Sequence, residues 1–139
     1  MADIHIADFH RDCTSILTLL YRSFPRKVQL FVDDISGPAD PDEFGLPSAR
    51  HQACFATMLW LAEAGYITYH STIRQEALDQ VTLSHMGFNL LSAPAQLPHA
   101  DTPGAAHIEH LRQALRSGSS SHLQAAVLHL FEHSFRYRS

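Results

Sequence analysis

The sequence predicts a mainly α-helical fold that carries a small β element and ends in a helical hairpin. Apolar residues recur at helical spacing over most of the chain. Short runs of β-branched and aromatic residues interrupt this pattern and favour strands. With 139 residues, of which 45% are hydrophobic, the chain is long enough to bury a core of its own.

Residues 8–24 are expected to form the first helix, with Asp8 as its N-cap. Pro25 ends this helix because proline cannot donate the next backbone hydrogen bond. Residues 28–32, VQLFV, are rich in β-branched and apolar side chains, which predicts a short strand. Residues 33–36 are expected to form a short second helix.

Ser48 is expected to cap the helix that organises the rest of the chain. Cys54, Met58 and Leu61 recur at helical spacing and predict its buried face. Gly65 stands where a left-handed residue commonly ends a helix.

Residues 66–69 predict a strand that pairs with a second strand at residues 81–83. Ile67 is expected to face the core, and Tyr66 is expected to be more exposed. A serine-capped helix follows, and its Gly87 costs about 1 kcal/mol relative to alanine. Because glycine otherwise weakens a helix, Gly87 predicts that another backbone segment approaches closely at this position.

The order of helix, strand, loop, strand and helix over residues 48–93 resembles a winged helix-turn-helix of bacterial transcriptional regulators. Residues 61–67, LAEAGYI, look like that family's exit from the recognition helix. Residues 83–91, LSHMGFNLL, look like its exit from the wing. The acidic, proline-broken insert at residues 37–47 departs from the family, which normally has a compact second helix and a tight turn there.

Three segments are expected along the chain. Residues 1–93 would form the winged-helix domain, and residues 94–104 would form a proline-rich linker. Residues 105–139 would form the C-terminal helical hairpin, whose apolar faces need a cover.

The chain is mildly acidic, and its cysteine content suits a protein of a reducing compartment. The formal net charge is −4 with neutral histidines, from 10 Lys and Arg against 14 Asp and Glu. Cys13 and Cys54 lie on apolar helical faces, so both are expected to be buried free thiols. With no secretory leader or membrane-spanning run recognised, a cytoplasmic protein is expected.

The resemblance implies binding of double-stranded DNA by a transcriptional regulator. Arginine and glutamine can read guanine and adenine edges, and arginine or lysine can contact phosphates. The residues expected to contact DNA are Arg50, His51, Gln52 and Thr57 on the third helix, Arg74 in the wing, and Arg26 and Lys27 at its flank. Because so few cations are available, any DNA binding is expected to be weak and sensitive to salt.

The alternative is a winged-helix module that binds another protein and not DNA. Leu59 and Trp60 are apolar at positions where DNA-binding relatives commonly carry polar residues. Val127, Leu130 and Phe131 lie on the last helix, and they predict a homodimer formed through the helical termini.

Metal binding and catalysis are weaker hypotheses. The pairs His107/His110 and His129/His133 have spacings at which one helix face can bind a metal. Polar helix faces that happen to use histidine are the favoured explanation, and no metal or other cofactor is predicted. The sequence contains no Gly-x-Ser-x-Gly, phosphate loop or Cys-x-x-Cys, so no enzyme activity is expected.

Overall fold

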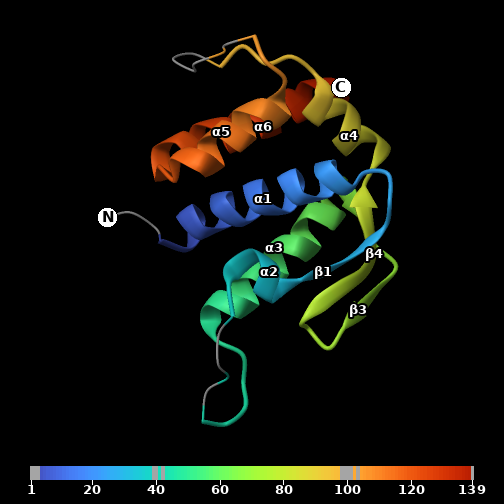
Figure 1. Cartoon of the computed structure of the whole chain (residues 1–139), viewed down its shortest axis with the longest axis vertical. Coiled ribbons are helices and arrows are strands. Elements are labelled where there is room, and N and C mark those ends of the chain that lie inside the picture. Colours follow the sequence, from blue (N-terminus) through green and yellow to red (C-terminus); the bar gives the residue numbers. More distant parts are fainter. Residues whose placement is uncertain (1–3, 39–40, 42, 98–101, 103, 139) are drawn as a thin grey trace.

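The computed structural model describes residues 4–38, 41, 43–97, 102 and 104–138, and only the backbone of residues 135–138. Helices dominate, and they pack around a small antiparallel sheet (Figure 1). The elements of the described chain are α1 (Ile4–Ser23), β1 (Val28–Phe31), α2 (Val32–Ser36), α3 (Ala49–Glu63), β2 (Ile67–Thr68), β3 (Ser71–Ile73), β4 (Ala77–Leu83), α4 (His85–Ser92), α5 (His107–Ser117) and α6 (Ser120–Arg138).

Strand β4 is the centre of the sheet. It pairs antiparallel with β1 on one side and with both β2 and β3 on the other. Ile67 lies opposite Leu83, so the predicted pairing of the two strands is confirmed. The second strand is longer than expected because it already begins at Ala77, where it pairs with Phe31 of β1.

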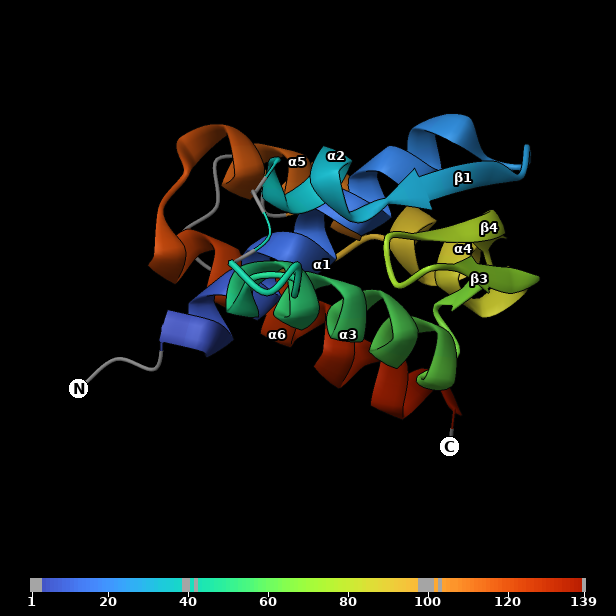
Figure 2. The same ribbon diagram turned by 90° about the horizontal axis from the view of Figure 1, so that it is seen from below.

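Helix α1 lies between α3 on one side and the α5–α6 hairpin on the other (Figure 1). Figure 2 shows the sheet and α4 gathered at one end of this helical layer. The buried residues of α1 belong to one hydrophobic core that includes residues of α3, the sheet and the hairpin. Helix α1 begins at Ile4, so the prediction that Asp8 caps it is wrong; no glycine or proline between Ile4 and Asp8 interrupts the helix.

Helix α3 begins and ends as expected. The Ser48 hydroxyl accepts a hydrogen bond from the backbone N–H of His51 at 3.1 Å. Gly65 follows the helix with φ +91°, the left-handed conformation that glycine adopts without strain. Cys54, Met58 and Leu61 are fully buried, which confirms the predicted inner face. Cys54 and Cys13 are both free and buried, also as predicted.

Tyr66 is not exposed as predicted, because only 5% of its surface is accessible. Its ring lies 6.3 Å from that of Trp60 and 5.4 Å from that of Phe131. Helix α6 therefore covers the Tyr66 side chain, which the alternation of residues along the strand predicts to be exposed.

The predicted close approach at Gly87 is confirmed. A Cβ atom built on Gly87 would lie 2.2 Å from the carbonyl oxygen of Tyr66. Ser84 holds the two segments together, since its hydroxyl donates to the Gly65 carbonyl at 2.6 Å and accepts from the Gly87 N–H at 2.9 Å.

The start of the predicted linker pairs with the first residues of the predicted hairpin segment. Pro94 forms a β-bridge with Ala106, and the Ala95 N–H donates to the Ala105 carbonyl at 2.9 Å. Leu97 is 6% exposed. The middle of the segment, residues 98–101 and 103, lies outside the described residues.

The hairpin has its cover within the same chain. Val127 and Leu130 are fully buried, because α1 and α5 pack against α6. The premise that these residues need a second copy to hide them is therefore wrong. Across the described residues, no helix combines the length and apolarity needed to span a membrane.

Candidate functional site

Arg50 points from α3 toward α1. Its guanidinium group donates to both carboxylate oxygens of Asp12, at 2.7 and 2.5 Å, and its Nε lies 3.7 Å from Asp8. Asp12 is 1% exposed, and this hydrogen-bonded pair raises the pKa of Arg50. Arg50 therefore neutralises a buried carboxylate, and it is not directed outward as a DNA-reading residue.

The other three predicted DNA-reading residues on α3 also make hydrogen bonds within the chain. A ring nitrogen of His51 lies 2.9 Å from the Gln75 carbonyl oxygen. Thr57 is 5% exposed and donates to the Ala53 carbonyl at 3.0 Å, so little of its side chain is available to another molecule. Gln52 is exposed, and its amide donates to the Pro47 carbonyl at 2.9 Å.

The remaining predicted phosphate contacts lie at opposite ends of the sheet. Arg74 is exposed in the turn between β3 and β4 with φ +51°. Arg26 and Lys27 are exposed just before Val28, the far end of β1. Since β1 runs from Val28 to Phe31 and a strand rises about 3.3 Å per residue, β1 alone separates these cations by roughly 10 Å.

The outer face of α3 is apolar. It forms a groove of about 280 Å³ with the turn after β3, and we call this the α3 groove. It is lined by His51, Gln52, Phe55, Ala56, Leu59 and Gln75. Beside it, Trp60 is 40% exposed and packs against the rings of Phe9 and Phe131, with centroids 5.2 and 5.3 Å away. Of the predicted interface residues, Leu59, Trp60 and Phe131 thus retain partly exposed surface.

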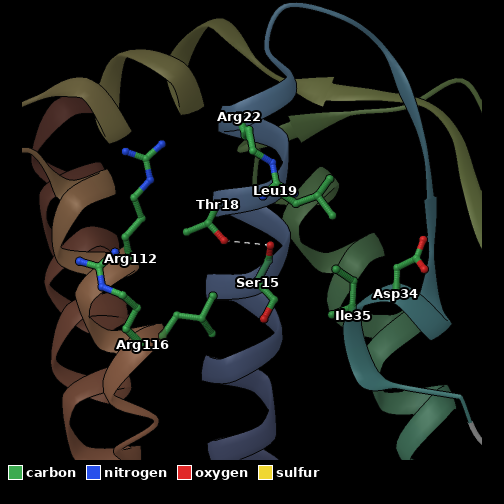
Figure 3. Close-up of a pocket in the computed structure, with 9 residues that line it drawn as sticks. Ser15, Thr18, Leu19, Arg22, Asp34, Ile35, Arg112 and Arg116 are labelled. Carbon is green, nitrogen blue, oxygen red and sulfur yellow. Dashed lines mark hydrogen bonds between the residues drawn. The ribbon is translucent and has the colours of Figure 1, made fainter.

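A second and larger groove, of about 520 Å³, lies over α1 between α2 and α5 (Figure 3). We call it the arginine groove. It is lined by Ser15, Thr18, Leu19, Arg22, Asp34, Ile35, Arg112, Leu115 and Arg116. Figure 3 shows Arg112 and Arg116 on the α5 wall and Asp34 and Ile35 on the α2 wall. The sequence analysis missed this groove, although Arg112 and Arg116 stand four residues apart, the spacing of neighbours on one helix face.

The histidine pairs of α5 and α6 converge on His107. A nitrogen of His107 lies 2.7 Å from one of His133, and the His129 ring centroid is 5.5 Å away. Burial is the main cause that lowers the pKa of His107, to about 4, and the neighbouring histidines, including His110, lower it further. Among the described residues, no group of three or more His, Cys, Asp or Glu side chains is arranged to hold a metal ion.

We expect the free energy of unfolding to fall as the pH is lowered from about 6.5 toward 4. His107 is neutral in the folded chain over this range, whereas the unfolded chain binds the proton near pH 6.5. The groups that face His107 are His110 on α5 and His129 and His133 on α6, and Glu132 lines the adjacent pocket.

Urea denaturation at pH 7 and pH 5 measures this dependence. His107→Gln is expected to flatten the dependence, whereas His85→Gln, at an exposed position on α4, is expected to leave it unchanged. Equal pH dependence in the parent and the His107→Gln variant would contradict the assignment to His107.

Comparison with protein-family models, curated proteins and solved structures found no match for this chain.

Proposed function

We infer that this chain is a winged-helix module that binds another protein through the α3 groove. The order of α1, β1, α2, α3 and three further strands supports the winged-helix assignment. So does the sheet order, in which β4 lies between β1 and β2. In a winged helix, a first short strand pairs in this way with the strands of the wing.

The apolar outer face of α3 carries the proposal. Phe55, Ala56 and Leu59 line the groove where a DNA-binding relative needs hydrogen-bonding and cationic side chains. Arg50, the one cation of α3, is held by Asp12. An apolar groove beside a partly exposed tryptophan is typical of a protein interface.

The test places a photo-crosslinking residue at Gln52, which is exposed at the edge of the groove. Crosslinking in cells of the source organism is expected to yield one dominant adduct, identified by mass spectrometry. Leu59→Arg is expected to abolish this adduct because it places an unpaired charge in the groove. Leu128→Arg is the matched control, since Leu128 is 47% exposed on α6. An adduct that survives Leu59→Arg, or the absence of any adduct, overturns the proposal.

Binding of DNA in transcriptional regulation is the second candidate, and the exposed cations Arg74, Arg26 and Lys27 favour it. Three phosphate contacts per chain correspond to a salt slope of about −2.7, since each contributes about −0.9. A titration with genomic fragments at ~50 mM salt tests this, with Arg74→Gln as the variant. Binding that Arg74→Gln weakens, while Leu59→Arg leaves it unchanged, would favour DNA over a protein partner.

A homodimer would bring a second set of these cations to the same DNA. Because Val127 and Leu130 are buried, its interface would use other residues, and Phe131 is the partly exposed member of the predicted set. Light scattering at micromolar concentration distinguishes a monomer from a dimer.

A further inference from the structure

We propose that the arginine groove binds a small phosphomonoester, no larger than a mononucleotide. This proposal rests on α1, α2 and α5, and it is independent of what occupies the α3 groove. At about 520 Å³, the volume lies within the roughly 300–1,000 Å³ range of small-molecule sites.

The α5 wall offers guanidinium groups whose N–H donors are only loosely engaged, and the guanidinium group of Arg112 also lies over the Tyr21 ring, 5.5 Å from its centroid. Arg112 and Arg116 share one carboxylate, Glu109, at 3.7 and 3.4 Å. These distances exceed the 2.7–2.9 Å that is typical of strong charge-assisted hydrogen bonds. The two side chains are 40% and 65% exposed, so the ion pairs are screened by solvent and add little. Most of their N–H donors therefore stay available for a ligand anion.

Helix α1 adds a third cation and a hydroxyl donor to the floor of the groove. Arg22 is exposed and has no ion pair within the described chain. The Thr18 hydroxyl donates to the Thr14 carbonyl at 2.8 Å, so its proton is used. The Ser15 hydroxyl has no hydrogen-bond partner among the described residues, which leaves its proton free for a phosphate oxygen.

The charge balance favours a dianion beside the three arginines of the groove. Three arginines face two carboxylates, Asp34 and Glu109, and Glu109 lies on the same helix as two of those arginines. A phosphate monoester carries close to two charges above its second pKa of about 6, and three acceptor oxygens match guanidinium forks. A carboxylate offers only one charge and two oxygens.

The α2 wall suits the uncharged part of such a ligand. Figure 3 shows Asp34 and Ile35 across the groove from the arginines of α5. The exposed carboxylate of Asp34 can accept hydrogen bonds from sugar hydroxyls. Leu19, Ile35 and Leu115 provide apolar surface for a sugar carbon face or a base.

Isothermal titration calorimetry with adenosine 5′-monophosphate at pH 7.5, in a buffer free of phosphate and sulfate, tests the proposal. Saturable binding is expected for this probe and for ribose 5-phosphate, and none is expected for adenosine. Inorganic phosphate is expected to compete. Equal binding of adenosine, or no saturable binding of either phosphomonoester up to ~10 mM, overturns the proposal.

Variants locate the binding in the groove. Arg116→Gln is expected to raise the Kd of ribose 5-phosphate at least tenfold, with no change in Tm, because this side chain is 65% exposed. Ser15→Ala is expected to raise the Kd about threefold, and Thr18→Val is expected to leave it unchanged, since its hydroxyl proton is already used. Arg26→Gln is the matched control, because it removes one arginine charge at an exposed position outside the groove. An unchanged Kd in Arg116→Gln, or an equal loss in Arg26→Gln, overturns the assignment.

Discussion

Replacing Gly87 with alanine is expected to lower the free energy of unfolding by about 3 kcal/mol. The added Cβ atom would lie 2.2 Å from the carbonyl oxygen of Tyr66 and 3.1 Å from its carbonyl carbon. Both contacts are with backbone, so no side chain can rotate to relieve them. The segment just before β2, Gly65 and Tyr66, would have to move away from α4, which would also weaken the Ser84 hydrogen bonds that join the two.

Thermal and urea denaturation measure the effect of this substitution. Gly104→Ala is the matched control. A Cβ atom added at Gly104 would lie 3.8 Å from its nearest neighbour, the Gln96 side chain, which is an ordinary van der Waals distance. The control is expected to have the stability of the parent chain. A Gly87→Ala variant as stable as the Gly104→Ala variant would contradict the packing described between β2 and α4.

Replacing Arg50 with alanine is expected to cost about 3–4 kcal/mol. The substitution leaves Asp12, which is 1% exposed, without the guanidinium group that donates to both of its carboxylate oxygens. A buried carboxylate without a partner is destabilising because its charge has lost both water and counter-charge.

A double-mutant cycle separates the ion pair from packing. Asp12→Asn combined with Arg50→Ala removes the buried charge, so the double variant is expected to be more stable than Arg50→Ala alone. Urea denaturation at pH 7 gives the coupling free energy. If the two substitutions are additive, the Arg50–Asp12 pair does not stabilise the fold.

Local sequence signals predict the middle of this chain well because the relevant interactions are local. Ser48 caps α3 through an amide three residues away, and Gly65 ends the helix through its own backbone conformation. Gly87 differs, because it is a local signal of a tertiary contact: a glycine within a helix is costly, and the close approach of the Tyr66 carbonyl accounts for it.

Contacts between distant residues explain what the sequence does not predict. Arg50 has the chemistry of a DNA-reading residue, but its partner Asp12 lies 38 residues earlier in the chain. Tyr66 is buried by Phe131 of α6, which is even more distant in sequence. The arginine groove takes its walls from α1, α2 and α5, so no single segment carries its pattern.

The central position of α1 matters while the chain is being synthesised. Helix α1 is synthesised well before α5 and α6, which cover one of its sides. Its apolar residues on that side therefore remain uncovered until α5 and α6 have emerged from the ribosome. Until then the growing chain exposes apolar surface of the kind that makes partly folded proteins prone to aggregation.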